Sequence, residues 1–589
     1  MKTVRTRYLL LSALILMLCA QGLQAQAPLE PAQLPANTTF YFIWRGQPSA
    51  ELKKSNSIAA LWDDPDFAPV RSSLTRALLK NSEEKSDAEK SKEPRLTREQ
   101  LEQYATLLEN PFVFGYLSDP NKKHSEASAK TGPGKATPWK GIFFVYDRTG
   151  KEAILSKAVL SLRANEKEVP QISQVTIADV PALKIDRKSG LTYWVEDGKY
   201  AVSANETVVL EEILHRLHGK SASSGSITDS AAYREAKSVL GSGQLEFFMR
   251  VPEMKNLAPD PSAGGFQIGP VLEAMKLDAI HCIAGRVLLE GAKTRVQAAA
   301  LGDTAPGSLF DIWDSGTPVP PGLSVVPADA ISYSDTQINL DHLYAFIKRV
   351  ATSIMPPSRQ GSSVDMLEMM AQAKLGQSLS SAVALFTGEF VSLQTNRSLD
   401  NDKQVYLIGI RNKPDTLKLL HSVLGDRITA EHAEGDTTFL KVSSGGGQSA
   451  AGTAAWDFYH VAATPDYLVI SSSVESVRDL LAKRAQSAKA GISTTSGFQA
   501  ARTQFPANVN GLGYFDFRKV DWPDLKARLI AEANKPPATK RPGAPKAETT
   551  PTPSWMLDVN PEVFARHLHS ASSASWKDAQ GLHFDEWIE

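Results

Sequence analysis

Cysteine is almost missing from this sequence: its 589 residues include only Cys19 and Cys282. So few thiols exclude the disulfide framework that holds many small exported domains together, and stability has to come from buried apolar area. Cys282 lies in the apolar run of residues 279–284, which is typical of a strand. We interpret it as a small buried hydrophobe rather than a reactive thiol.

An excess of charge of one sign is also missing. The 64 Lys and Arg residues nearly balance the 65 Asp and Glu residues, which gives a formal net charge of -1. A nucleic-acid-binding surface needs a clustered basic face, and the sequence has no large basic cluster. We therefore expect no nucleic-acid partner.

Recognisable catalytic motifs are missing as well. The sequence has no Gly-x-Ser-x-Gly motif, and no dinucleotide-binding glycine pattern follows an expected strand. Gly219-Lys220-Ser221 resembles the end of a phosphate-binding loop, but Leu214 stands where that loop needs its first glycine. We therefore name no catalytic or cofactor-binding residue, and we expect a protein that is not an enzyme and uses no cofactor.

Long apolar runs are scarce, and the one near the N-terminus, residues 9–18, is too short to span a membrane. Basic residues precede it, and Ala25 offers a small residue at which a signal peptidase can cut. Residues 1–25 are thus predicted to be a signal peptide. The mature chain is expected to be secreted or periplasmic, without a transmembrane span.

Cys19 raises an alternative, because it stands where a lipoprotein signal places its lipidated cysteine. Lipidation signals generally have a small residue just before that cysteine, and Leu18 is bulky. The sequence therefore favours cleavage after Ala25, with a lipid anchor at Cys19 as the alternative.

What the sequence does contain is a repeated pattern. A run of aromatic and β-branched residues occurs at residues 193–203 and again at residues 458–471, and a helical pattern follows each run. In both copies an isoleucine lies six residues before an aromatic residue: Ile227 before Tyr233, and Ile492 before Phe498. The repeated spacing predicts a duplicated folding unit whose copies share core residues and turns.

Strands are expected at corresponding places in the two copies. They are residues 40–44, 112–116, 142–146, 180–185 and 247–251 in the first copy, and 330–333, 390–393, 405–410, 438–442 and 514–518 in the second. Strands in succession with interspersed helices predict an α+β fold of two related units, each a mainly antiparallel sheet with helices packed against it. The first unit is predicted to cover residues 26–320 and the second residues 321–530.

A β-hairpin is expected after each copy. In the first unit it covers residues 279–301, with its turn at Gly291. In the second unit residues 556–589 are predicted to complete the fold, with a first strand at Val563–Ser570. The Pro/Ala/Lys-rich segment 531–555 before it is predicted to be disordered, because its composition buries too little apolar surface.

His567, His569 and His583 form the best metal-like group in the chain. In a strand, His567 and His569 would face the same side and could meet one ion, with His583 and Asp585 near them. Histidines near a terminus are more often surface residues, so we assign no metal site and keep these three as weak candidates.

The aromatic residues allow two interpretations. Trp44, Trp194, Trp456 and Tyr467 alternate with polar neighbours in expected strands, which favours core positions. The alternative is that aromatic residues of this set line a groove for a sugar or a lipid.

Several of these features are similar to those of a family of exported bacterial proteins known as a domain of unknown function, number 3352. They are the openings at residues 34–36 and 326–328, the passages from strand to helix after Tyr200 and Tyr467, the hairpin at residues 277–301, and the ending at residues 567–584. The resemblance implies an envelope location and a duplicated α+β body. It implies no catalytic residue.

The sequence thus predicts an exported, non-enzymatic protein that binds or scaffolds an unknown partner or ligand in the cell envelope. One alternative is a hydrolase of envelope polymers with a site between the copies. Another is a carrier of a lipid or other hydrophobic ligand. A hydrolase needs a pocket where a carboxylate or serine meets a base, and a carrier needs a long apolar cavity.

Overall fold

A computed structural model describes residues 27–72, 106–118, 141–156, 171–187, 190–220, 225–254, 273–313, 316–354, 360–397, 399, 403–443, 458–533 and 559–589. The predicted signal peptide, Cys19 and Trp456 lie outside these residues, as does the predicted disordered segment 531–555 apart from the end of α17 (Trp522–Ala533). Within the described part of the chain, none of the helices has both the length and the apolar character that crossing a bilayer requires.

The described residues divide into two compact units. The first unit contains the described residues up to 254 together with residues 280–302. The second unit contains residues 273–279 and the described residues from Asp303 onward. This division falls earlier than the predicted boundary at residue 320. The reason is visible at Lys577, whose ammonium group donates hydrogen bonds to the carbonyl oxygens of Phe310 and Trp313, at 3.1 and 2.7 Å, and so ties this stretch to the second unit.

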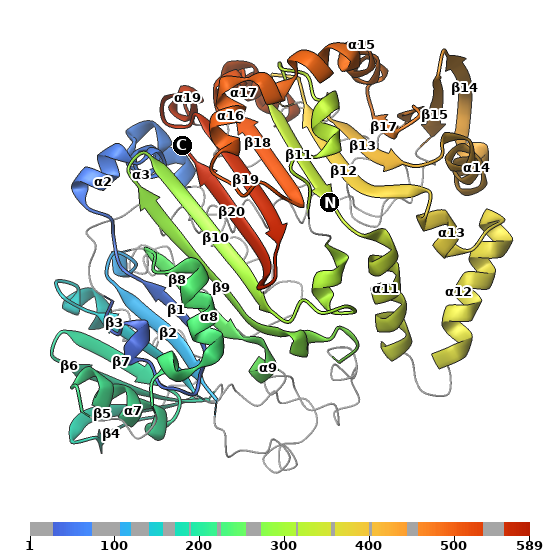
Figure 1. Ribbon diagram of the computed structural model, residues 1–589. Helices are drawn as coiled ribbons and strands as arrows, with labels where there is room; N and C mark the ends of the chain where they lie inside the picture. The colour runs from blue at the N-terminus through green and yellow to red at the C-terminus, as the bar shows by residue number, and fades with distance from the viewer. Residues whose placement is uncertain are drawn as a thin grey trace, which may run out of the picture. The chain divides into compact units, whose positions relative to one another are not determined.

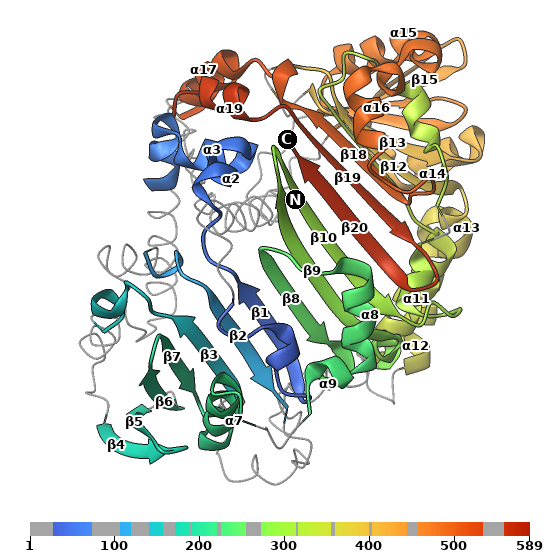
Figure 2. The same ribbon diagram turned by 60° about the vertical axis from the view of Figure 1, so that its left-hand side comes forward.

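The sheet of the first unit is antiparallel throughout, with the strand order β4-β5-β6-β7-β3-β2-β1-β8-β9-β10 (Figures 1 and 2). Its strands are β1 (Thr38–Trp44), β2 (Phe112–Leu117), β3 (Ile142–Asp147), β4 (Gln171–Ile177), β5 (Val180–Arg187), β6 (Gly190–Asp197), β7 (Tyr200–Ala204), β8 (Leu245–Arg250), β9 (Ile280–Glu290) and β10 (Lys293–Gly302). The last two form the predicted hairpin, and its turn contains Gly291 with φ +58°, a conformation that favours glycine.

The sheet of the second unit is also antiparallel and has the order β14-β15-β16-β17-β13-β12-β11-β18-β19-β20. Its strands are β11 (Ser332–Gln337), β12 (Phe386–Gln394), β13 (Val405–Ile410), β14 (Ile428–Glu434), β15 (Thr437–Ser443), β16 (Phe458–Ala463), β17 (Tyr467–Ser471), β18 (Gly511–Asp516), β19 (Ser570–Lys577) and β20 (Gly581–Ile588). Strand for strand this is the order of the first unit. The predicted α+β class and the antiparallel pairing of the strands are confirmed.

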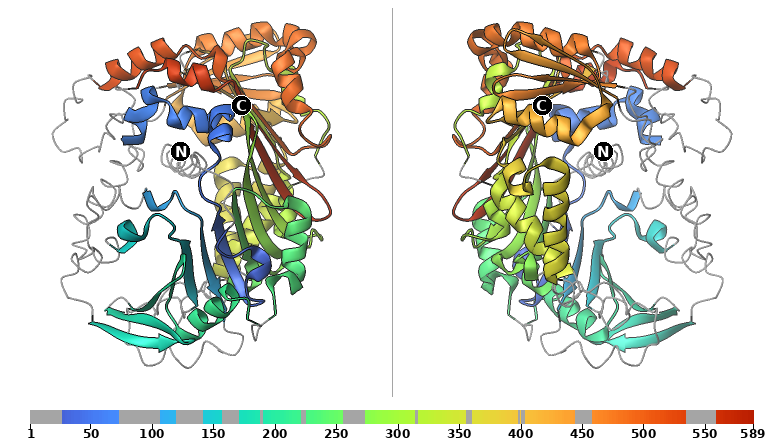
Figure 3. Two further views of the ribbon diagram at one scale, coloured as in Figure 1. Left: turned by 90° about the vertical axis from the view of Figure 1, so that its left-hand side faces the viewer. Right: turned by 90° about the vertical axis from the view of Figure 1, so that its right-hand side faces the viewer.

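Helices accompany each sheet. The described helices of the first unit are α2 (Ala50–Ser55), α3 (Ser57–Asp63), α7 (Thr207–Leu217), α8 (Ala231–Leu240) and α9 (Val251–Met254). Those of the second unit are α11 (Leu340–Ile354), α12 (Gln360–Leu375), α13 (Leu379–Val383), α14 (Lys413–Leu424), α15 (Val474–Ala490), α16 (Ser496–Arg502), α17 and α19 (Glu562–His567). Figure 3 shows α11 and α12 side by side.

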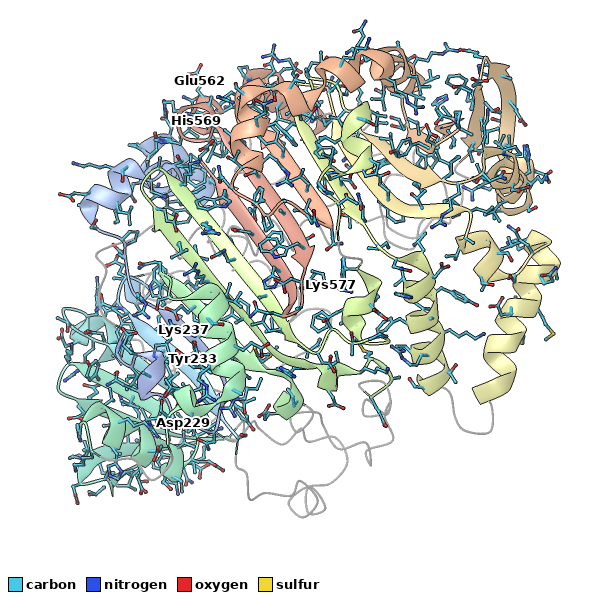
Figure 4. The ribbon with its side chains drawn as sticks, viewed as in Figure 1. Asp229, Tyr233, Lys237, Glu562, His569 and Lys577 are labelled. Atoms are coloured by element: carbon cyan, nitrogen blue, oxygen red, sulfur yellow. The ribbon has the colours of Figure 1, made fainter. Side chains whose placement is uncertain are left out.

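The main core of each unit lies between one face of its sheet and two helices. In the first unit Leu210 and Ile213 of α7 and Tyr233 of α8 pack on inward-facing strand residues such as Val145 and Val202. Ser230 begins α8 by accepting a hydrogen bond from the Tyr233 amide, which satisfies a free N–H group at the helix start. Figure 4 shows Tyr233 and Lys237 on this helix.

The corresponding core of the second unit uses α15 and α16. Val477 and Leu480 of α15 and Phe498 of α16 pack against strand residues that include Leu407 and Val469. In both units the two helices follow a pair of neighbouring strands, β6 and β7 in the first unit and β16 and β17 in the second. The helical patterns predicted after residues 203 and 471 are thus present.

The predicted strand Val563–Ser570 is wrong. Val563 and the residues up to His567 form α19, and the strand before the last hairpin turn is β19, Ser570–Lys577. The first residues of β19, Ser-Ala-Ser-Ser-Ala-Ser, carry no large apolar side chain. Burial nevertheless alternates along them, so the strand is specified by its pairing with β18 and β20 rather than by a visible apolar pattern.

Candidate functional site

A groove lies over strands β4 to β6 of the first unit, with a volume of ≈ 480 Å³. Its described lining consists of Gln174, Val175, Thr176, Pro181, Ala182, Leu183, Trp194 and Glu196. Trp194 and Leu183 are directly paired across β5 and β6 and are half-buried. The volume falls in the range of small-molecule sites, which combine apolar walls with a few polar groups.

The polar groups of the groove centre on Glu196. The Trp194 indole N–H donates to Glu196 Oε1 at 3.3 Å, and Arg148 Nη1 lies 2.7 Å from Glu196 Oε2. Arg148 also donates to the Gly198 carbonyl oxygen, which fixes its guanidinium group. The Glu196 side chain remains 34% exposed, so its oxygens can accept further hydrogen bonds from a ligand.

The same face of the second unit is filled. Leu440 pairs with Val461 across β15 and β16, as Leu183 pairs with Trp194 across β5 and β6. Leu440 is 1% exposed and Val461 is 7% exposed. Both belong to an apolar cluster that includes Leu417, Leu420 and Leu424 of α14.

The position of Glu196 makes the same contrast. Glu196 lies two residues after Trp194, and the corresponding residue of the second unit, two residues after Val461, is Ala463. Ala463 is completely buried. A charged side chain there needs water or a polar partner, so the two units use this face differently.

A second candidate site is a buried acidic cluster in the second unit. Asp335 of β11 is 2% exposed and Glu389 of β12 is 6% exposed. The Tyr333 hydroxyl donates to Asp335 Oδ2 at 3.0 Å, and the Tyr467 hydroxyl donates to Glu389 Oε2 at 2.8 Å. The amide of Gly322 donates to Glu389 Oε1 at 2.5 Å. Two carboxyl groups are therefore held together away from water by three donors.

Burial and the neighbouring Glu389 carboxylate raise the pKa of Asp335 to about 8. Burial also raises the pKa of Tyr333 and that of Tyr467, so both hydroxyls keep their protons and act as donors. Asp335 Oδ1 has no hydrogen-bond partner among the described residues, a further reason against a full charge on that carboxyl. One proton shared by two acids describes this cluster near neutral pH.

The first unit has no acids at these places. Ile43 takes the place of Asp335, because it pairs with Val113 as Asp335 pairs with Val391. Pro111 takes the place of Glu389, because each lies two residues before that paired valine. The fold can therefore be built with an apolar residue at the Asp335 position. Sequence reasoning missed both acids, although each one interrupts an otherwise uncharged strand.

The weak metal candidates do not share a strand. His567 is the last residue of α19, and His569 lies between this helix and β19 (Figure 4). His583 lies on β20, stacks on Trp576 with ring centroids 5.1 Å apart, and is 3.0 Å from Asp578 Oδ1. The expectation that His567 and His569 face one side of a strand is therefore wrong. No group of three or more potential ligands of the His, Cys, Asp or Glu type is found within the described part of the chain.

Cys282 is completely buried, and its thiol donates to the Ala232 carbonyl oxygen at 3.4 Å. Burial raises its pKa to about 12, so the reactive thiolate is not populated at neutral pH. The interpretation as a small buried hydrophobe is confirmed.

The aromatic residues separate into both predicted kinds. Trp44 is completely buried and donates through its indole nitrogen to the Leu108 carbonyl oxygen at 2.8 Å. Tyr467 is also in a core, whereas Trp194 lines the groove.

Comparisons with known proteins give no relative for this chain: no family model matches it, and neither the curated proteins nor the solved structures contain a match.

Proposed function

We propose that this chain is an exported envelope protein that arose by duplication of one α+β unit and binds a ligand without chemical conversion. The shared order of strands within the sheet supports the duplication. Matched aromatic contacts support it as well: Tyr233 packs on both Tyr41 and Phe248 in the first unit, and Phe498 packs on both Tyr333 and Tyr514 in the second. The resemblance to the exported family of unknown function agrees with this proposal.

The observation that carries the binding function is the contrast between Trp194 and Val461. One fold position is an aromatic wall beside a partly exposed carboxylate in the first unit and a buried aliphatic residue in the second. The second unit keeps the same strand pairing with an aliphatic residue there, so the fold does not require the half-buried Trp194 or its Glu196 partner. We therefore assign the groove to ligand binding.

The ligand that best fits the groove is a short saccharide of the envelope. A sugar ring has an apolar C–H face that can lie on the indole of Trp194 and hydroxyl groups that can bond to Gln174, Thr176 and Glu196. A carrier of lipids is less well supported, because an acyl chain has no group that could donate a hydrogen bond to the exposed Glu196 carboxylate. A hydrolase is less well supported, because Arg148 neutralises Glu196.

Isothermal titration calorimetry tests this assignment. The purified full chain is titrated with oligomers of β-1,4-linked N-acetylglucosamine, and the heat of binding is measured. We expect saturable binding that Trp194→Val abolishes and that Asp329→Asn, a surface change in the second unit, leaves intact. Equal binding by the Trp194→Val variant, or no heat with any oligomer, would reject the saccharide assignment.

Export is tested separately in the native host. Fractionation is expected to place the protein in the periplasm or the medium, and crosslinking there would give its neighbours. Recovery of the protein in the cytoplasm would contradict the export proposal. It would not bear on saccharide binding in the groove, which the titration tests.

A further inference from the structure

We propose that the Asp335–Glu389 pair is a proton-dependent latch that holds the 3-10 segment Pro321–Val325 on the sheet of the second unit and releases it as the pH rises. This inference concerns the second unit and does not depend on the groove of the first.

The segment Pro321–Val325 covers the acid pair. Its Gly322 amide donates to Glu389 Oε1 at 2.5 Å. A Cβ atom on Gly322 would lie 3.1 Å from both Asp335 Oδ2 and Glu389 Oε1, so the glycine backbone stands directly against both carboxyl groups. Leu323 and Val325 of the same segment are buried in the core. Displacing this segment would therefore open the pair to water.

The state of the pair depends on one proton. With Asp335 protonated, Glu389 carries the charge and receives hydrogen bonds from Gly322 and Tyr467. Loss of the Asp335 proton places two negative charges side by side in a region with almost no water, and Coulomb repulsion is strongest there. Hydration of the pair relieves this repulsion, which requires that Gly322 move away.

Among the described residues, the groups that face the pair provide no compensating positive charge at close range. Tyr333 comes from β11 itself and Tyr467 from β17, and both are neutral donors. Arg484 of α15 lies over the Tyr467 ring, with its guanidinium carbon 6.0 Å from the ring centroid, and so acts on the pair only across that ring. Leu407 of β13 and Leu512 of β18 are apolar, and the segment Pro321–Val325 has no titratable side chain.

The first unit contains a matched segment without the acids. Ile227 donates its amide to the Leu34 carbonyl oxygen at 2.9 Å, as Ile492 donates to the Val326 carbonyl oxygen at 3.1 Å. The 3-10 helix Pro31–Gln33 before Leu34 therefore corresponds to the residues before Val326. Because Ile43 and Pro111 replace the two acids, this segment serves as a control within the same molecule.

Hydrogen exchange of the full chain, read by mass spectrometry between about pH 6 and pH 9 and corrected for intrinsic rates, tests the latch. For peptides that cover residues 320–326 we expect protection to fall by up to about tenfold per pH unit as the pH rises toward the titration of Asp335 near pH 8, and to level off above it, because opening releases a proton only while the closed pair still holds one. Peptides from residues 28–34 should keep constant protection.

Two variants decide the cause. Asp335→Asn keeps a donor toward Glu389 and removes the titration, so protection of residues 320–326 should become independent of pH. Glu389→Gln removes the second charge and should do the same if the first variant does not fold. The latch is overturned if wild-type protection does not change with pH, if the folded variants keep the wild-type response, or if the whole second unit loses protection together.

Discussion

Asp335 and Ile43 occupy the same position in the two sheets: Asp335 pairs with Val391 across β11 and β12, and Ile43 pairs with Val113 across β1 and β2. Ile43 is completely buried and Asp335 is 2% exposed. The same position is therefore equally buried in both units, but only the second unit has a titratable side chain there. This relationship allows the energetic effect of the acid to be separated from that of the fold.

Asp335→Asn is expected to stabilise the protein at pH 8 and to leave it unchanged at pH 4. The folded-state pKa of Asp335 is raised to about 8 from an ordinary value of 3.8. Between these values the folded chain holds a proton that the unfolded chain has released, so wild-type stability falls as the pH rises, by roughly 1.4 kcal/mol per unit for one proton. Urea unfolding at several pH values measures the difference between the two proteins.

Asp329→Asn is the matched control for this experiment. Asp329 is 56% exposed and lies 2.8 Å from Lys483, a surface pair that contributes little to stability. A constant difference between Asp335→Asn and wild type from pH 4 to pH 8 would contradict a proton shared in the acidic cluster.

Tyr467→Phe is expected to lower the free energy of unfolding by about 1.5–3 kcal/mol at neutral pH, because the buried Glu389 carboxylate loses a 2.8 Å hydrogen bond. Tyr200→Phe changes the corresponding tyrosine at the start of β7, which is half-exposed, and should cost less than about 0.5 kcal/mol. Chemical denaturation of both variants measures the contrast. Equal losses would show that the acidic cluster does not depend on the Tyr467 hydroxyl.

The fold could be predicted from the sequence where strands are runs of aromatic and β-branched residues. Strands β1, β3 and β13 and the hairpin β9–β10 have such patterns, and they lie where the sequence places them. Strand β14 (Ile428–Glu434) was not predicted, because every residue after Ile428 is exposed and its sequence carries no apolar alternation. Its conformation comes from pairing with β15, which local sequence does not reveal.

The candidate sites were harder to predict than the fold. Trp194 was named as a possible groove residue, but only the structure distinguishes its half-buried position from the buried position of Val461. Asp335 and Glu389 are single acids far apart in the sequence, and the pairing of β11 with β12 brings them together. No local pattern predicts an interaction that depends on strand order.

Val461→Trp should destabilise the protein more than Trp194→Val, although both changes exchange the same two residue types at equivalent positions. Val461 is 7% exposed among leucines of α14, so the larger indole overpacks the site, at a cost of about 1–3 kcal/mol. Trp194 is half-buried at the edge of a groove, and its replacement removes apolar contact without leaving a closed cavity. Thermal unfolding of the two variants compares the effects, and a larger loss for Trp194→Val would contradict an open groove.

Cys282 should resist thiol reagents in the native protein. Its side chain is completely buried on β9, and burial raises the pKa of the thiol to about 12, so almost no thiolate exists at pH 8. In urea the thiol becomes exposed and returns to an ordinary pKa, and it should then react with an aromatic disulfide within minutes. The native rate therefore reports opening of the first unit. If Cys282 reacted as fast in buffer as in urea, the hairpin β9–β10 would not be packed against α8 in solution.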